Sequence, residues 1–423
     1  MLIGRRMAFT LASMMSATAV ALPAPSVVAS VAITAGPTLL AETSVAVDPT
    51  NDQHVVVLAD RYGTHTSIVM VESFDGGRSW SRQRALIPPG FTTTYDSTVR
   101  FTPTGGLVVA GGAARPTSPG CNADSSVFVA DLASSGEVPY RLVRSVSGLN
   151  RFTDRPALIV DQRSGATFVS WTESAGPLAA CRGRPILSST RVSYAEPGEA
   201  FSAPVQVPSS GLVAPYGSSL AVTATGSLVV AVGEYDTSGR SRLVIAESVD
   251  GARTFTLPAV VATRPAPTRR WKWRGWVSAV PSLASTVEGR LAVSWVGTSG
   301  VRQSPMVWER TPTGWIDVSP TTAPVGDTVL STVRFSAEGA LWLTSASIAG
   351  GVITFTVDRY LVAWVGPRTV SSTPATLREL GELVGLDAAG CNVVVAVPLD
   401  ASDRSSVLVS RFTGEELHCY SSS

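Results

Sequence analysis

Short apolar runs separated by turn residues recur along almost the whole chain. The stretches "LVVAVGEY" at 228–235 and "RLVIAES" at 242–248 are rich in β-branched residues and are flanked by glycine, serine, threonine and aspartate. Such runs are too short for ordinary helices and are typical of strands. No amphipathic helix of ordinary length interrupts them after residue 29, so the pattern predicts an all-β protein.

The strand pattern itself repeats along the chain. The sequence from Ser44 to Trp80 matches a second copy from Ser219 to Phe255, and two further segments share the motif "STVRF", at 97–101 and 331–335. Each module reads as apolar strand, turn, apolar strand, loop, alternating strand, tight turn and aromatic-led strand. Aligning the turns gives seven modules of about 50 to 60 residues, which start near Ser44, Ser97, Pro156, Ser219, Ser282, Ser331 and Glu382.

Four antiparallel strands repeated at this period predict a β-propeller. Seven blades fit best, and six remain open if two weak modules merge. A propeller must close to remove its sheet edges, yet the last module shows only three clear strands. We expect its fourth strand to come from "ELHCYSS" near the C-terminus or from "SVVASVAIT" near the N-terminus.

Two tight turns carry the same polar motif, "SFDGGRSW" at 73–80 and "SVDGARTF" at 248–255. The aspartate can accept backbone N–H groups of the turn, and glycine permits a positive φ. The motif resembles the Asp-box, or BNR repeat, of sialidase-like β-propellers. That resemblance implies a structural role, on the face opposite any active site, for Ser73, Asp75, Gly77, Trp80, Ser248, Asp250 and Phe255.

The N-terminus reads as a secretory leader. Arg5 and Arg6 precede an apolar run, and small residues offer cleavage sites after Ala21 or Ala29. We expect residues 1–29 to be a signal peptide and residues 30–423 to form one propeller domain, secreted to an extracellular or periplasmic space. A net charge of +1 gives no reason to expect nucleic acid as a partner, and we expect no stable membrane insertion.

Four cysteines in an exported chain indicate disulfides. Three connectivities are possible. Cys121 and Cys181 fall in loops between second and third strands of neighbouring blades, and Cys391 and Cys419 both fall in the last blade, so we favour these two pairs.

Polar residues gather where first strands begin and second strands end, which is the upper face of a propeller. Their carboxylates and guanidinium groups suit a sugar ligand. We predict Tyr216, Glu234, Asp96 and Asp154 as catalytic candidates and Arg155, Arg61, Asp60 and Glu173 as ligand-binding candidates, with Glu42 in the same region. The stretch "TRRWKWRGW" adds Trp271, Trp273 and Trp276, which form either a stacking platform or a filler between blades.

The resemblance to sialidases does not transfer their catalytic residues cleanly. Those enzymes use three arginines, a tyrosine paired with a glutamate, and an aspartate, and an early Arg-Ile-Pro motif is absent here. "DRP" at 154–156 is the nearest match. Tyr216 could be the nucleophile with Glu234 as its partner. Tyr95 occupies the same position in another module, however, and a tyrosine repeated in this way indicates a structural role.

The sequence therefore predicts a secreted, sialidase-like propeller that binds or processes extracellular carbohydrate on its upper face. Whether it is an enzyme stays open. The alternatives are an active exo-sialidase or other glycoside hydrolase, and a non-catalytic protein-interaction propeller. We expect a monomer with no cofactor and predict no metal-ligating residues, and a calcium requirement stays open.

Overall fold

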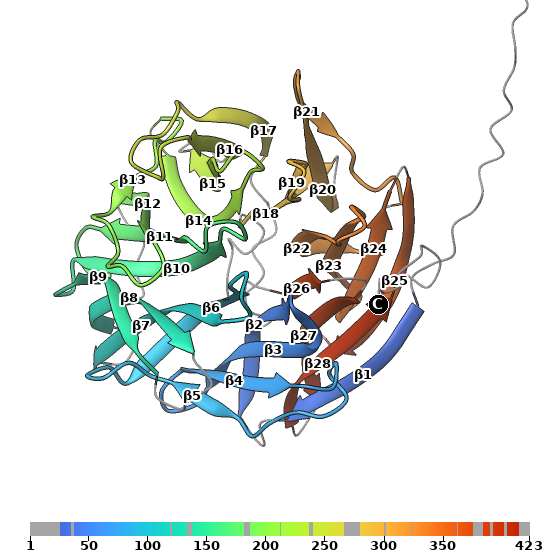
Figure 1. Ribbon diagram of the computed structural model, residues 1–423, viewed down its shortest axis with the longest axis horizontal. Coiled ribbons are helices and arrows are strands. Elements are labelled where there is room, and N and C mark those ends of the chain that lie inside the picture. Colours follow the sequence, from blue (N-terminus) through green and yellow to red (C-terminus); the bar gives the residue numbers. More distant parts are fainter. Residues whose placement is uncertain are drawn as a thin grey trace, which may run out of the picture.

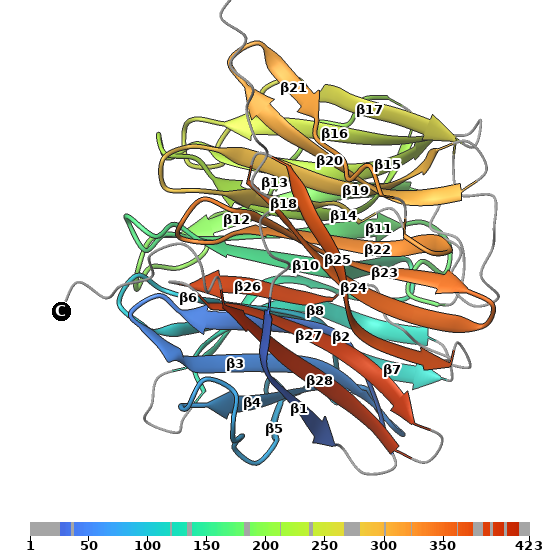
Figure 2. The same ribbon diagram turned by 90° about the vertical axis from the view of Figure 1, so that its right-hand side faces the viewer.

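The computed structural model is a ring of β-sheets seen face-on in Figure 1 and edge-on in Figure 2. It describes residues 26–34, 38–118, 121–132, 138–181, 187–211, 213–236, 240–265, 280–299, 302–322, 324–361, 363–374, 384–389, 392–401 and 404–413. Every regular element among these residues is a strand. None of these segments forms an apolar helix of membrane-spanning length.

Seven four-stranded antiparallel sheets make up the ring, so the seven-bladed alternative is confirmed. Blades 1 to 3 comprise β2 (Leu39–Asp48), β3 (Asn51–Tyr62), β4 (Ser67–Ser73) and β5 (Arg84–Leu86); β6 (Thr93–Phe101), β7 (Leu107–Ser118), β8 (Cys121–Leu132) and β9 (Tyr140–Val146); and β10 (Arg151–Val160), β11 (Thr167–Ala175), β12 (Leu187–Ala195) and β13 (Val205–Gln206). Blades 4 and 5 comprise β14 (Val213–Val222), β15 (Leu228–Asp236), β16 (Arg240–Ser248) and β17 (Ala259–Pro265); and β18 (Ser282–Ser285), β19 (Leu291–Ser299), β20 (Arg302–Thr311) and β21 (Gly314–Asp317). Blades 6 and 7 comprise β22 (Asp327–Phe335), β23 (Leu341–Ala349), β24 (Val352–Tyr360) and β25 (Trp364–Pro374); and β26 (Gly385–Ala389), β27 (Asn392–Ala401), β28 (Arg404–Thr413) and β1 (Ser26–Thr34).

The N-terminal strand closes the ring. Of the two predicted closing segments, "SVVASVAIT" is the right one, because β1 pairs antiparallel with β28 from Ser26↔Thr413 to Thr34↔Ser406. Figure 1 shows β1 as the outermost strand beside β28, so chain segments from opposite ends complete one blade. This pairing covers the edge that β28 would otherwise expose.

The apolar core lies between blades rather than within one central layer. Each of the seven contacts between neighbouring blades holds its own cluster of buried side chains. Because a blade is covered on both faces, its inner strands lose the alternation of a half-exposed strand, and Val55 to Ala59 of β3 are all buried. This explains the continuous runs of valine, leucine and alanine in the sequence.

Side-chain hydroxyls tie the first strand of one blade to the next. The serines that begin several modules accept main-chain N–H groups across the gap, while threonines donate to carbonyl oxygens. The bonds run from Val99 N to Ser44 Oγ at 3.2 Å, from Leu283 N to Ser219 Oγ at 2.9 Å, from Val333 N to Ser282 Oγ at 3.2 Å, and from Thr98, Thr332 and Thr43 Oγ1 to the carbonyls of Pro156, Val384 and Ala396. The repeated serine of the sequence is therefore an inter-blade staple.

The turn at 73–80 joins β4 to β5 and is held by its own side chains. Asp75 Oδ1 accepts the backbone N–H groups of Arg78 and Ser79, both at 2.9 Å, and Oδ2 accepts the Ser79 hydroxyl at 2.6 Å. Ser73 Oγ accepts the N–H of Gly77 at 2.7 Å. The Ser79 bonds hold the pKa of Asp75 below its ordinary value of 3.8.

The turn at 248–255 joins β16 to β17 and repeats this network. Asp250 accepts the N–H groups of Arg253 and Thr254 at 3.0 and 2.9 Å, and Ser248 Oγ accepts that of Ala252 at 2.9 Å. Ala252 has φ 63°, so alanine adopts the left-handed conformation that glycine favours here, and its methyl is buried in the core. Both turns follow a third strand, on the face opposite the start of the first strands.

Asp358 of β24 is a buried carboxyl in blade 6. It is 5% exposed, and Gly366 packs so closely that an added Cβ would lie 2.5 Å from Asp358 Oδ1. Burial raises the pKa of Asp358 from 3.8 to about 7.

We predict that Ser44→Ala lowers the free energy of unfolding by about 1 to 2 kcal/mol, because the buried N–H of Val99 loses its acceptor. Chemical denaturation of the variant and of an exposed control, Ser147→Ala, measures the difference. Equal losses in both variants would show that the staple contributes nothing specific.

We also predict that Asp358 makes stability fall as the pH rises. Between pH 4 and 7 the unfolded chain has an ionised Asp358 while the folded chain holds it protonated, so the free energy of unfolding decreases through this window. At pH 8, Asp358→Asn should be more stable than the wild type by roughly 2 to 4 kcal/mol and should unfold at a higher temperature. Near pH 4 the two proteins should have the same free energy of unfolding. Thermal melts from pH 4 to 8, with the exposed Asp317→Asn as control, test this; a gain of the same size at pH 4 contradicts it.

Candidate functional site

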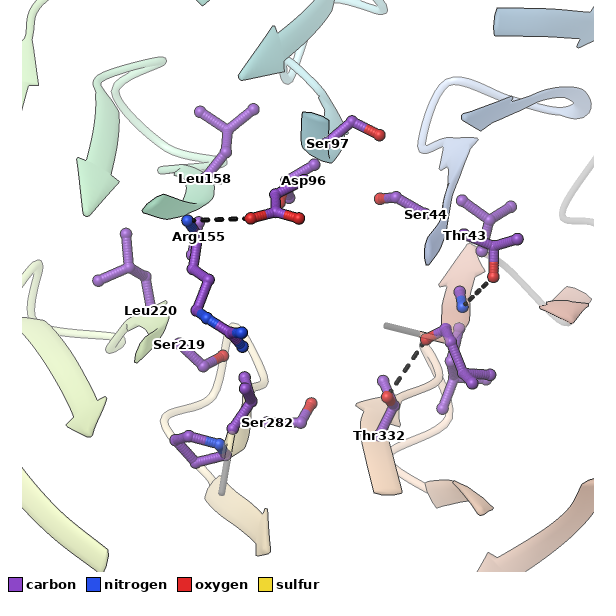
Figure 3. Close-up of a pocket in the computed structure, with 18 of the residues that line it drawn as sticks. Thr43, Ser44, Asp96, Ser97, Arg155, Leu158, Ser219, Leu220, Ser282 and Thr332 are labelled. Carbon is purple, nitrogen blue, oxygen red and sulfur yellow. Dashed lines mark hydrogen bonds between the residues drawn. The ribbon is translucent and has the colours of Figure 1, made fainter. Parts of the chain in front are cut away.

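A central cavity, called the channel below, lies on the axis of the ring, and both polar and apolar side chains line it. It has a volume of about 110 Å³ and is lined by residues of the first strand of every blade (Figure 3). Hydroxyl groups, three arginines and one aspartate provide the polar part of its wall: Thr43, Ser44, Asp96, Ser97, Thr98, Arg100, Arg155, Ser218, Ser219, Ser282, Ser331, Thr332 and Arg334.

The upper end of this channel, where the first strands begin, departs from regular strand geometry in blades 1 to 4. The register shifts between Ala41 and Ser44 in β2, and the same irregularity recurs in β6, β10 and β14. One residue in each irregularity has a left-handed backbone: Glu42 (φ 53°), Asp96 (φ 52°), Arg155 (φ 51°) and Gly217 (φ 85°). Non-glycine residues seldom adopt this conformation, and bulges commonly re-aim side chains near sites.

Three buried carboxylates meet at this end of blades 1 and 2. Glu42, Asp60 and Asp96 each place an oxygen within 4.8 Å of the other two, and they are 1%, 0% and 8% exposed. Asp60 Oδ2 accepts the N–H of Asp96 at 3.0 Å. The predicted candidates Asp60 and Asp96 therefore converge, and Glu42 joins them; carboxylate oxygens of this kind are the ligands that hard cations such as Ca²⁺ prefer.

Arg155 continues this chain of contacts into blade 3. Its backbone N–H donates to Asp96 Oδ2 at 3.2 Å, and its Nε lies 3.7 Å from Asp154 Oδ2. Figure 3 shows the side chain extending along the channel wall towards Ser219 and Ser282. The Asp154 side chain is 31% exposed, which makes it the accessible acid of this group.

Tyr95 packs between blades 2 and 3, which indicates a structural role. Its ring stacks on Phe152 at 5.7 Å, its hydroxyl donates to the Thr153 carbonyl at 2.9 Å, and Gly112 leaves the space that the ring fills. Burial raises the pKa of Tyr95 well above 10, and the charges of Asp154 and Asp96 raise it further. Tyr216 precedes Gly217 as Tyr95 precedes Asp96, but its side chain lies outside the described residues.

Glu173 lies apart from the carboxylate group, between blades 2 and 3. Arg144 donates to its two oxygens at 3.0 and 3.1 Å, and Arg151 donates to Oε1. Burial raises the pKa of Glu173, but the hydrogen bonds and charge of Arg144 outweigh this and lower it. The side chain thus joins two blades.

Glu234 lies in blade 4, opposite Pro215 of β14. It is 1% exposed and accepts the N–H of Ser210 at 3.2 Å and its hydroxyl at 2.6 Å. Burial raises its pKa despite these bonds and the charge of Arg242. Arg61 follows Asp60 on β3 and so projects from the other face of the sheet.

The other end of the channel carries arginines that the sequence analysis did not single out. Arg334 Nε lies 3.4 Å from Asp387 Oδ1, and Asp387 Oδ2 accepts the N–H of Val47, so this pair joins blades 6, 7 and 1. Burial lowers the pKa of Arg334 and raises that of Asp387. Arg100 donates to the Val99 carbonyl at 2.7 Å. The shared "STVRF" motif was the signal for both arginines.

The disulfide between Cys121 and Cys181 is confirmed, and it links the first residue of β8 to the segment after β11. It spans 60 residues and joins blades 2 and 3 on the upper face. Cys391, Cys419, Trp271, Trp273 and Trp276 lie outside the described residues, so the second pair and the stacking platform stay predictions.

No family model and no curated protein matches this chain. Solved structures do: a protein of unknown function from Dyadobacter fermentans DSM 18053 is similar with a TM-score of 0.56 and 12% identity, over 93% of this chain and 100% of that one. The Hadza microbial sialidase Hz136 gives 0.52 and 13%, over 85% and 76%. The Penicillium chrysogenum α-L-arabinanase complexed with arabinobiose gives 0.52 and 11%, over 91% and 98%. Likeness at this identity shows a shared propeller fold.

Proposed function

We propose that this protein is a secreted propeller that binds extracellular carbohydrate at the upper mouth of its channel, across blades 1 to 3. The observation that carries the proposal is the convergence of Glu42, Asp60, Asp96 and Arg155 from four strands at the upper ends of blades 1 to 3, with the Asp154 side chain 31% exposed beside them. Carboxylate oxygens and a guanidinium group can accept and donate several hydrogen bonds to vicinal hydroxyls.

The charge balance at the mouth indicates the chemistry of the ligand. Arg155 Nε lies 3.7 Å from the carboxylate of Asp154, and its backbone N–H donates to Asp96, which clusters with the buried carboxylates of Glu42 and Asp60. This arrangement favours a ligand that donates hydrogen bonds, such as a neutral sugar, over one that presents a carboxylate. The partly buried ring of Phe152, stacked on Tyr95 next to Asp154, offers an apolar surface for a sugar ring.

The fold and the disulfide support an extracellular carbohydrate as the ligand. The similar solved structures include a sialidase and an arabinanase bound to arabinobiose, both of which act on sugars. A disulfide between Cys121 and Cys181 persists in oxidising compartments, which agrees with export through the N-terminal leader.

Glycoside hydrolysis is the second candidate, and one observation favours it. Carboxylates about 5 Å apart have the spacing of retaining glycosidases, and Asp96 lies within 4.8 Å of Asp60 and Glu42. Against this, Asp60 and Glu42 are almost fully buried, and Asp60 and Asp96 already accept main-chain N–H groups. Hydrolysis needs two accessible carboxylates, whereas binding needs only hydrogen-bonding groups such as the accessible Asp154 beside Arg155, so binding is the function that the geometry supports better.

We predict that the mature protein binds neutral glycans on a glycan array and that Asp154→Asn weakens this binding about tenfold, which corresponds to about 1.4 kcal/mol. Arg155→Lys should weaken it similarly, because lysine lacks the fork of donors. Asp317→Asn, on the outer strand β21, is the matched control and should bind as the wild type does. Parallel arrays with Ca²⁺ and with EDTA show whether the carboxylates act through a cation. Wild type that binds no glycan, or variants that bind normally, would contradict the proposal.

For hydrolysis, we predict that any activity on a panel of fluorogenic glycosides depends on Asp96 and Asp154. Asp96→Asn or Asp154→Asn should reduce kcat at least 100-fold, since acid–base catalysis contributes about that much. Glu234→Gln should leave it unchanged, because Glu234 is buried and holds Ser210, while Tyr216→Phe tests the remaining catalytic candidate. The opposite pattern, with activity on a sialoside lost in Tyr216→Phe, would instead support the sialidase alternative.

A further inference from the structure

The strand that closes the ring overlaps the predicted leader. β1 begins at Ser26, whereas a signal peptide of residues 1–29 would end inside it. Cleavage after Ala29 would remove Ser26, Val27 and Ala29, which pair with Thr413, Phe412 and Arg411 of β28. Only the pairs from Ser30↔Ser410 to Thr34↔Ser406 would remain.

This loss would fall on a part of the ring that is otherwise well buried. Phe412 is 0% exposed and packs near Trp342, and Ser410 is 1% exposed. Without its partner strand, the end of β28 would present unpaired main-chain groups at a sheet edge, which is a site of fraying and aggregation.

Cleavage after Ala29 would also place a new positive charge, the amino terminus of Ser30, close to other cations. An amino terminus at Ser30 would lie one register position from Arg411. Arg411 donates to Asn392 Oδ1 at 2.7 Å in a half-buried position that Arg78 also approaches, with Asp52 as the nearby acid. An added ammonium group beside two guanidinium groups raises the electrostatic free energy of the closed ring.

The other predicted position avoids both costs. "AVA" at 19–21 has alanine at both small-residue positions, whereas "VVA" at 27–29 has valine at the first. Cleavage after Ala21 leaves Met7–Thr18 as the apolar segment, within the roughly 7 to 15 residues typical of leaders, and keeps Leu22–Pro25 ahead of an intact β1.

We propose that the leader is cleaved after Ala21, so that the exported chain begins at Leu22 and carries its complete closing strand. In this step a signal peptidase of the exporting cell hydrolyses the Ala21–Leu22 amide bond with one water, leaving a carboxylate on Ala21 and an amino group on Leu22. The inference rests on the export that the proposed function includes.

N-terminal sequencing and intact-mass measurement of the full chain, exported from a bacterial host, test the inference directly. We expect Leu22 as the first residue. A first residue of Ser30, or any residue within β1, overturns the cleavage position while leaving export standing. A chain that keeps Met1 overturns export and the cleavage site together.

Two variants test which of the two sites the peptidase uses, and two chains of different length test whether the complete β1 stabilises the ring. Ala21→Arg should leave the precursor uncleaved, whereas Ala29→Arg should be processed at the wild-type position; cleavage of Ala21→Arg after Ala29 contradicts the inference. Chains that start at Leu22 and at Ser30, each exported behind the same unrelated leader, should differ in melting temperature by at least about 3 °C in favour of the longer chain. Equal melting temperatures would remove the physical basis of the inference.

Discussion

The structure depends on one constraint, which is that each blade must cover both faces of its sheet with another blade. The seven buried clusters all lie between neighbouring blades. A blade alone would therefore expose two apolar faces, and a row of blades would expose one at each end. Only a closed ring satisfies every face, so β1 and β28, from opposite ends of the chain, must meet.

Closure of the ring surrounds the channel with the first strands of all seven blades, and the candidate site lies at the upper end of this channel. First strands crowd around the axis, where hydroxyls such as those of Ser44 and Ser282 accept main-chain N–H groups of the next blade. At the upper end this regular pattern stops. Bulges in blades 1 to 3 place Glu42, Asp96 and Arg155 in a left-handed backbone at the mouth. The candidate site thus lies at the upper strand ends, where charged residues replace the hydroxyl groups that join neighbouring blades.

The architecture followed from the sequence because it rests on local and repeated signals. The module order, the Cys121–Cys181 pair and the two aspartate turns each depend on neighbouring residues or on blade position. The contacts of the candidate site residues could be predicted from the sequence only in part. Asp60 and Asp96 lie close together in the structure, but Glu173 has its partners in Arg144 and Arg151, and Glu234 in Ser210. Such partners depend on register and on the spacing between blades, which periodicity does not encode.

The arrangement of charge along the channel bears on the comparison with sialidases. Three arginines line the cavity, but they are not assembled around one point of the mouth: Arg334 pairs with Asp387, Arg100 donates to the Val99 carbonyl, and Arg155 lies beside Asp154. Each of the three arginines therefore makes its own separate contacts along the channel, and under the proposed function only Arg155, beside Asp154 and Asp96, would face a sugar ligand.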